Sequence, residues 1–217
     1  MKAFAFSVAL FLILFSSSCR KFEQEKIVSE AIPYTPRNIY PVERLPKYLN
    51  RVAVMPTFDY DSSSNALTYS DDIFFKEIAK SGLFEVIPVT SLFCKTNFGK
   101  ERLSASESLP ENFFKLIDDE YGANGVLFID LHSSKPYRPL SIGVRAKLVD
   151  LKSGEFLWAV DETVDGGDAS VISAANLYQR SQHVQAISHK TSNSVLHSPR
   201  LFSKFVAKTL FQTLPIR

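Results

Sequence analysis

The sequence predicts a single α/β domain in which helices pack on a mixed sheet of about five strands. Short apolar runs of strand length alternate with helical stretches over residues 51–131, which is the pattern of parallel strands joined by helices. Residues 140–150 and 156–164 then flank a tight turn at residues 152–155, so we expect an antiparallel hairpin there. No repeat of fixed period is present, which excludes a solenoid or a propeller.

The composition is that of a globular protein. The 217 residues are 45% hydrophobic, and 25 basic side chains balance 23 acidic ones. Eighteen Phe and eight Tyr supply enough apolar volume for one sizeable core. The formal charge of +2 is spread along the chain without a dense Lys/Arg block, so nucleic acid is not an expected partner.

The first element is an apolar run at residues 3–15, preceded by Lys2. Its thirteen residues fall short of the about 20 that a transmembrane helix needs, and they suit a signal peptide over residues 1–18. Three serines and then Cys19 follow the run. This segment resembles a bacterial lipoprotein signal, in which Cys19 would carry the lipid (palmitate). Such signals usually have Leu where this chain has Ser16, and ordinary secretory cleavage at the same bond would leave the cysteine unlipidated.

Residues 19–50 form the next segment, in which four prolines, at positions 33, 36, 41 and 46, favour extended backbone. We therefore expect a lipidated, proline-rich tether. The alternative is that part of it, above all residues 39–42, packs on the domain as a strap. Cys94 lies in an apolar stretch and is expected to be a small buried hydrophobe, with a disulfide to Cys19 or a reactive thiol as the alternatives.

The folded domain is expected over residues 51–217. Residues 51–56 and 84–89 are apolar and predict buried strands. Ser70 is the expected cap of the helix between them, and Thr90 the expected cap of a short helix that follows.

Further caps divide the rest of the chain. Pro110 suits the first position of another helix, which Gly122 ends, and residues 125–131 predict a central strand. Asp168 and Ser198 are the expected caps of the last two helices.

Charged residues of the hairpin are the candidate partner-binding patches. In the first hairpin strand, Arg145 and Lys147 alternate with apolar residues, which predicts one wet face. Asp161, Glu162 and Asp165 form an acidic group on and beyond the second strand. Glycosidase-like or metal-binding work is an alternative for this group, but adjacent strand residues point to opposite faces, which argues against it.

Four segments in order suggest a family: residues 51–56 (RVAVMP), 82–87 (GLFEVI), 121–127 (YGANGVL) and 146–158 (AKLVDLKSGEFLW). Together they resemble the bacterial envelope lipoproteins related to CsgG, LpoB and the GNA-type lipoproteins, with a fold like the N-terminal domain of TolB. The resemblance covers about residues 51–165. It implies non-enzymatic roles in the envelope and supplies no catalytic residues. By the same kind of resemblance, Arg20 after the cysteine implies the outer membrane, with the domain in the periplasm.

The sequence contains no phosphate-binding loop, no Gly-x-Ser-x-Gly and no His-Glu-x-x-His. We therefore expect no catalytic residues, no metal and no cofactor. The favoured function is a lipid-anchored interaction module for an unidentified envelope protein, held on the membrane through its N-terminal lipid. The alternatives are a structural homo-oligomer or secretion-pore accessory subunit, and an envelope hydrolase.

Overall fold

The computed structural model describes residues 26–27, 29–60, 67–183 and 194–217. The predicted signal peptide and Cys19 lie outside the described residues. No helix in the described ranges is both long enough and apolar enough to cross a membrane.

The fold is one mixed sheet of seven strands, in the order β1-β7-β6-β5-β2-β4, with β3 paired to β5. The strands are β1 (Ile39–Pro41), β2 (Arg51–Val54), β3 (Phe58–Asp59), β4 (Glu85–Pro88), β5 (Gly125–Lys135), β6 (Ser141–Asp150) and β7 (Phe156–Asp165). β4, β2 and β5 are parallel, whereas β5, β6, β7 and β1 are antiparallel. The predicted fold class and the hairpin are confirmed. The sheet also contains β1 and β3, which the sequence did not predict, because strands of two or three residues are too short to show a hydrophobic period.

The helices are α2 (Leu67–Ala79), α3 (Ser91–Phe98), α4 (Phe113–Tyr121), α5 (Ala169–His183) and α6 (Pro199–Phe211), with a 3-10 turn η1 (Val195–His197) before the last. Two predicted caps are confirmed: Thr90 Oγ1 accepts from the Phe93 backbone N–H at 3.1 Å, and Ser198 Oγ from that of Leu201 at 3.4 Å. Gly122 ends α4 in the left-handed conformation, at φ 56°.

Two predicted helix starts are wrong. α2 begins at Leu67, so Ser70 lies inside the helix, where it is buried. The stretch before it contains several Ser, Asp and Asn residues, each able to cap a helix, and the sequence does not distinguish among them. α4 begins at Phe113 after a turn, so Pro110 precedes the helix instead of opening it.

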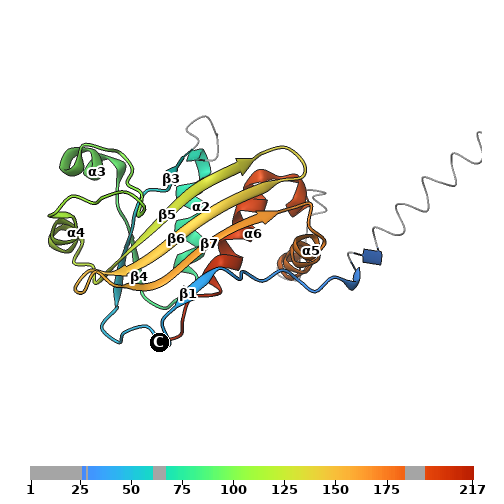
Figure 1. Cartoon of the computed structure of the whole chain (residues 1–217), viewed down its shortest axis with the longest axis horizontal. Helices are drawn as coiled ribbons and strands as arrows, with labels where there is room; N and C mark the ends of the chain where they lie inside the picture. Colours follow the sequence, from blue (N-terminus) through green and yellow to red (C-terminus); the bar gives the residue numbers. More distant parts are fainter. Residues whose placement is uncertain (1–25, 28, 61–66, 184–193) are drawn as a thin grey trace, which may run out of the picture.

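Helices cover the two faces of the sheet unequally (Figure 1). α2, α5 and α6 bury one face in a core that includes Phe74, Leu127, Trp158 and Phe202. The Trp158 indole is fully buried and its Nε1 donates to Thr213 Oγ1 at 3.0 Å, so this residue anchors the core. α3 and α4 bury only the part of the opposite face near β2 and the start of β5, in a second cluster around Phe128.

Cys94 belongs to this second cluster. It is fully buried and forms no disulfide within the described part of the chain, and burial raises the pKa of its thiol to about 11. A thiol with so high a pKa stays protonated and unreactive near neutral pH. The expectation of a buried, hydrophobic cysteine is confirmed.

Residues 34–50 pack on the domain as a strap. The Val42 backbone N–H donates to Leu157 O at 3.0 Å beyond the β1–β7 ladder, and that of Leu45 donates to Ile216 O at 2.9 Å. Leu45 and Leu49 are buried in the core on the helical side. Of the two arrangements that the sequence left open, the strap holds for this part of the predicted tether, because it supplies apolar side chains and an edge strand.

Candidate functional site

The strands β6 and β7 have one face that no described helix covers (Figure 1). Alternation along β6 places Val144, Ala146 and Leu148 in the helical core. Gly143, Arg145 and Lys147 therefore lie on the other face. We call this surface the polar sheet face and define it by His132, Arg145, Lys147, Asp161 and Thr163.

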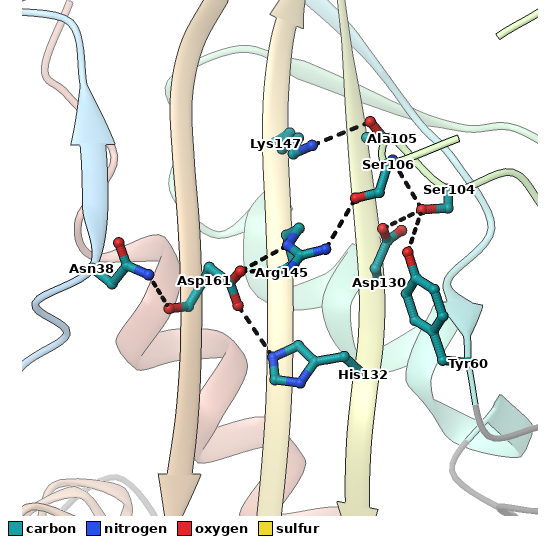
Figure 2. Close-up of polar contacts among 10 residues, drawn as sticks. All are labelled: Asn38, Tyr60, Ser104, Ala105, Ser106, Asp130, His132, Arg145, Lys147 and Asp161. Carbon is teal, nitrogen blue, oxygen red and sulfur yellow. Dashed lines mark hydrogen bonds and ion pairs between the residues drawn. The ribbon is translucent and has the colours of Figure 1, made fainter. Parts of the chain in front are cut away.

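An ion pair between Arg145 and Asp161 lies at the centre of the polar sheet face (Figure 2). The two residues are register partners on β6 and β7. Asp161 Oδ2 lies 2.8 Å from Arg145 Nε and 2.6 Å from Nη2. Hydrogen bonding to Asp161 raises the pKa of Arg145 above its ordinary value, so the guanidinium remains charged. The Asn38 side chain, next to β1, fixes this part of β7 by donating to the Asp161 backbone oxygen at 2.9 Å.

His132 reaches the same carboxylate from β5. It is the extra residue of a β-bulge between Leu131 and Ser133, and bulges redirect side chains in this way. Its Nε2 lies 3.2 Å from Asp161 Oδ1, close enough for an electrostatic contact but not aligned for a hydrogen bond. The imidazole lies over Gly143 of β6, where an added Cβ would come within 2.2 Å of the ring Cε1. Only glycine at this position lets the ring extend across the middle strand.

A buried carboxyl group lies one strand away from this ion pair. Asp130 is 1% exposed, and its Oδ2 accepts from Ser104 Oγ, which also contacts Tyr60 OH at 3.1 Å. Its Oδ1 has no hydrogen-bond partner among the described residues. Burial raises the pKa of the Asp130 carboxyl, because the charged form loses its hydration.

Residues 104–106 lie over the sheet and connect Asp130 to the two cations (Figure 2). Ser106 Oγ accepts from Arg145 Nη1 at 3.1 Å, and Ala105 O accepts from Lys147 Nζ at 3.1 Å. Lys147 Nζ also lies 5.5 Å from the centre of the Phe156 ring. Both predicted basic residues are therefore half-buried and ordered by neighbours, and Arg145 is the one with a charged partner.

The predicted acidic group is not brought together. Glu162 points to the opposite side of β7 from Asp161, where it holds the strap: its carboxylate accepts from Tyr34 OH at 3.0 Å, from the Asn38 N–H at 2.7 Å and from the Arg37 N–H. Asp165 Oδ1 accepts from the Gly167 N–H at 2.8 Å in the turn before α5. The three carboxylates therefore form no paired-carboxylate site. Within the described ranges, no three His, Cys, Asp or Glu side chains are grouped as a metal site.

The sequence reasoning did not find His132 or Asp130. The signal available lies along β5, where Phe128 is followed at alternate positions by the polar Asp130 and His132, between the apolar Leu127, Ile129 and Leu131. Strict alternation of this kind marks one polar face. No sequence pattern indicated the bulge at His132 or the free space over Gly143, which together allow the imidazole to reach Asp161.

No protein-family model matches the chain, and no curated protein does. Similar solved structures include the lipoprotein GNA1162 from Neisseria meningitidis (17% identity, TM-score 0.46, covering 64% of this chain and 99% of that one). They also include the LpoB C-terminal domain from Escherichia coli (15% identity, TM-score 0.37, covering 65% of this chain and 94% of that one). A third is a PelC L103M dodecamer from Paraburkholderia phytofirmans (15% identity, TM-score 0.42, covering 63% of this chain and 88% of that one).

GNA1162 and LpoB belong to the groups that the sequence resembles. The identities and TM-scores are too low to assign this chain to a family or to transfer a function to it. The resemblance to CsgG stays a prediction.

Proposed function

We propose that this chain is a lipid-anchored, non-enzymatic protein of the bacterial envelope, which binds another envelope protein through the polar sheet face. The supporting observation is the ordered ion pair of Arg145 and Asp161, contacted by the His132 ring, on a face that no described helix covers. The arginine and aspartate side chains are 32% and 36% exposed. A pair this exposed adds little net stability, because water screens it and ordering both side chains costs entropy. Recognition of a partner is a better reason for such an arrangement.

The neighbouring side chains have the chemistry of a protein interface. Tyr40 on β1 and Phe156 on β7 are 60% and 47% exposed. Tyr40 is the register partner of Ala159, which in turn faces Lys147, so tyrosine and lysine share one row of the polar sheet face. Aromatic residues and arginine are enriched in the centres of protein interfaces, and surrounding charges steer association.

The arrangement also supports binding over catalysis. The Arg145 guanidinium already bonds to Asp161 and Ser106, Glu162 bonds to the strap on the opposite side of β7, and Asp165 bonds to the turn that follows the strand. A glycosidase needs two carboxyl groups about 5 to 10 Å apart on either side of its substrate. Glu162 lies on the opposite side of β7 from Asp161, and Asp165 lies four residues further along the strand, at its end, so the three carboxylates do not suit that reaction.

Site-specific cross-linking tests the docking face. We expect a photoreactive residue at Thr163, which is exposed on the polar sheet face, to form a discrete adduct with one envelope protein in intact cells. The matched position is Lys76, whose side chain is 64% exposed on α2, on the helical side of the sheet.

Lys147→Glu should weaken the Thr163 adduct, more so at low ionic strength, whereas Lys152→Glu in the nearby turn should not. Equal adducts from both positions would contradict the proposal. An adduct with a second copy of this chain would favour the structural-oligomer alternative.

The anchor is a separate part of the proposal. Cys19→Ser should move the protein from the membrane fraction to the soluble fraction, because one residue carries the whole lipid attachment. Mass spectrometry of the wild-type mature chain should find the acyl mass, which the variant should lack. Retention of the variant on membranes after a salt wash would contradict anchoring through Cys19.

A further inference from the structure

A groove of about 430 Å³ lies between α3 and α4, and the polar sheet face contributes none of its lining. Its main lining residues are Leu92, Phe93 and Thr96 from α3 and Leu116, Asp119 and Glu120 from α4. Residues three and four positions apart lie on the same side of a helix. The spacing of these residues therefore places a lining stripe of each helix toward the other.

The apolar part of the groove is firmly supported from below. Phe93 packs edge to face on Tyr121 and on Phe98, with ring centres 5.1 Å and 5.8 Å apart. The next residue, Cys94, is fully buried. Leu92, in contrast, is 74% exposed in the first turn of α3. Leu92 therefore does not pack in the core, although it is adjacent to Phe93 and its aromatic contacts.

The other wall of the groove carries three carboxylates without an ion-pair partner among the described residues. Asp118, Asp119 and Glu120 are exposed in the last turn of α4, which contains no basic residue. The negative end of the helix macrodipole lies at that turn, so acidic side chains there are unfavourable. Arg51 of β2 already donates to Tyr121 O at the end of α4 at 3.3 Å. A further cation placed in the groove would relieve the repulsion among the three carboxylates.

We propose that the groove between α3 and α4 binds an amphipathic segment of a partner protein, one that carries an apolar anchor beside lysine or arginine. The anchor would cover Leu92 and Leu116, and the cation would pair with Asp119 and Glu120. Helix-in-groove recognition of this kind uses anchors at helical spacing. The acidic wall selects against an anionic membrane surface or an acidic peptide, because like charges brought together cost free energy. This binding surface is separate from the polar sheet face, so the chain could contact two proteins at once.

A random peptide library tests the sequence preference of the groove directly. Phage displaying 12-residue peptides would be selected on the immobilised full chain, with the Asp119→Asn/Glu120→Gln variant used for counter-selection. We expect the enriched peptides to combine Lys or Arg with a large apolar residue within one helical turn. A synthetic copy of an enriched peptide should bind the double variant about tenfold more weakly, as removal of close charge pairs at an interface predicts. Binding should also weaken in Leu92→Ser and at higher salt.

Two matched variants control for general effects. Glu111→Gln removes an exposed acid just before α4, and Leu177→Ser removes a leucine that is 50% exposed on α5. Neither should change the affinity of the peptide, and thermal unfolding should show that all variants fold. The proposal is overturned if the enriched peptides lack basic residues, if no peptide is enriched against the double variant, or if the controls weaken binding as much as the groove variants.

Discussion

Replacing Phe128 with alanine should lower the free energy of unfolding by about 3 to 5 kcal/mol, the cost of truncating a fully buried aromatic ring. The side chain is 1% exposed, and its ring centre lies 5.5 Å from that of Phe113 on α4. The resulting cavity would lie on β5, the strand that pairs with both β2 and β6. Urea unfolding is the measurement, followed by the fluorescence of the single Trp, which lies buried at position 158.

The control for this change is Phe156→Ala on β7, where the ring is 47% exposed. It should cost less than about 1 kcal/mol, because it loses only a partly exposed contact with Lys147. A loss of less than about 1 kcal/mol for Phe128→Ala as well would contradict the central position of β5.

Replacing Glu162 with alanine should detach the first part of the strap. Its carboxylate is the acceptor for Tyr34 OH and for the backbone N–H groups of Arg37 and Asn38. Loss of each charge-assisted hydrogen bond should lower the local stability of the strap by at most about 1.5 to 3 kcal/mol, because each donor can form a hydrogen bond to water once the strap opens. We expect backbone amides in residues 37–42 to exchange hydrogen at least about tenfold faster, which corresponds to about 1.4 kcal/mol of local stability.

Glu155→Ala is the matched change for the strap, since this glutamate is exposed on the same hairpin and contacts no strap residue of β1. It should leave exchange in residues 37–42 unchanged. The buried Leu45 and Leu49 should keep the later part of the strap in place in both variants. Unchanged exchange in Glu162→Ala would mean that the β1–β7 ladder alone holds the first part.

Local signals in the sequence predicted the elements whose cause is local. Thr90 and Ser198 cap their helices because a side-chain oxygen and the N–H groups that it satisfies are within three residues of each other. The hairpin of β6 and β7 follows from a short turn between a stretch of period two and a second apolar stretch of strand length. Where several polar residues competed for one role, as before α2, the same kind of signal gave the wrong helix start.

The strap and its strand β1 depended on distant parts of the chain. The prolines in residues 34–50 exclude a long helix, but they do not indicate which part of the domain the segment packs against. The choice between tether and strap was made by β7, which offers an unpaired edge, and by Glu162, which lies 124 positions from Asn38 along the chain.

The sequence by itself determined the α/β class, the hairpin, the caps of α3 and α6 and the basic residues of the polar sheet face, because each depends on the identity and spacing of neighbouring residues. Only the tertiary structure decided which charged groups meet. His132 reaches Asp161 across one strand, β6, over a glycine and from a bulge, whereas Glu162, adjacent to Asp161 in sequence, lies on the opposite side of the sheet. Pairing of strands fixes such distances, and it is a property of the whole sheet that no local pattern specifies.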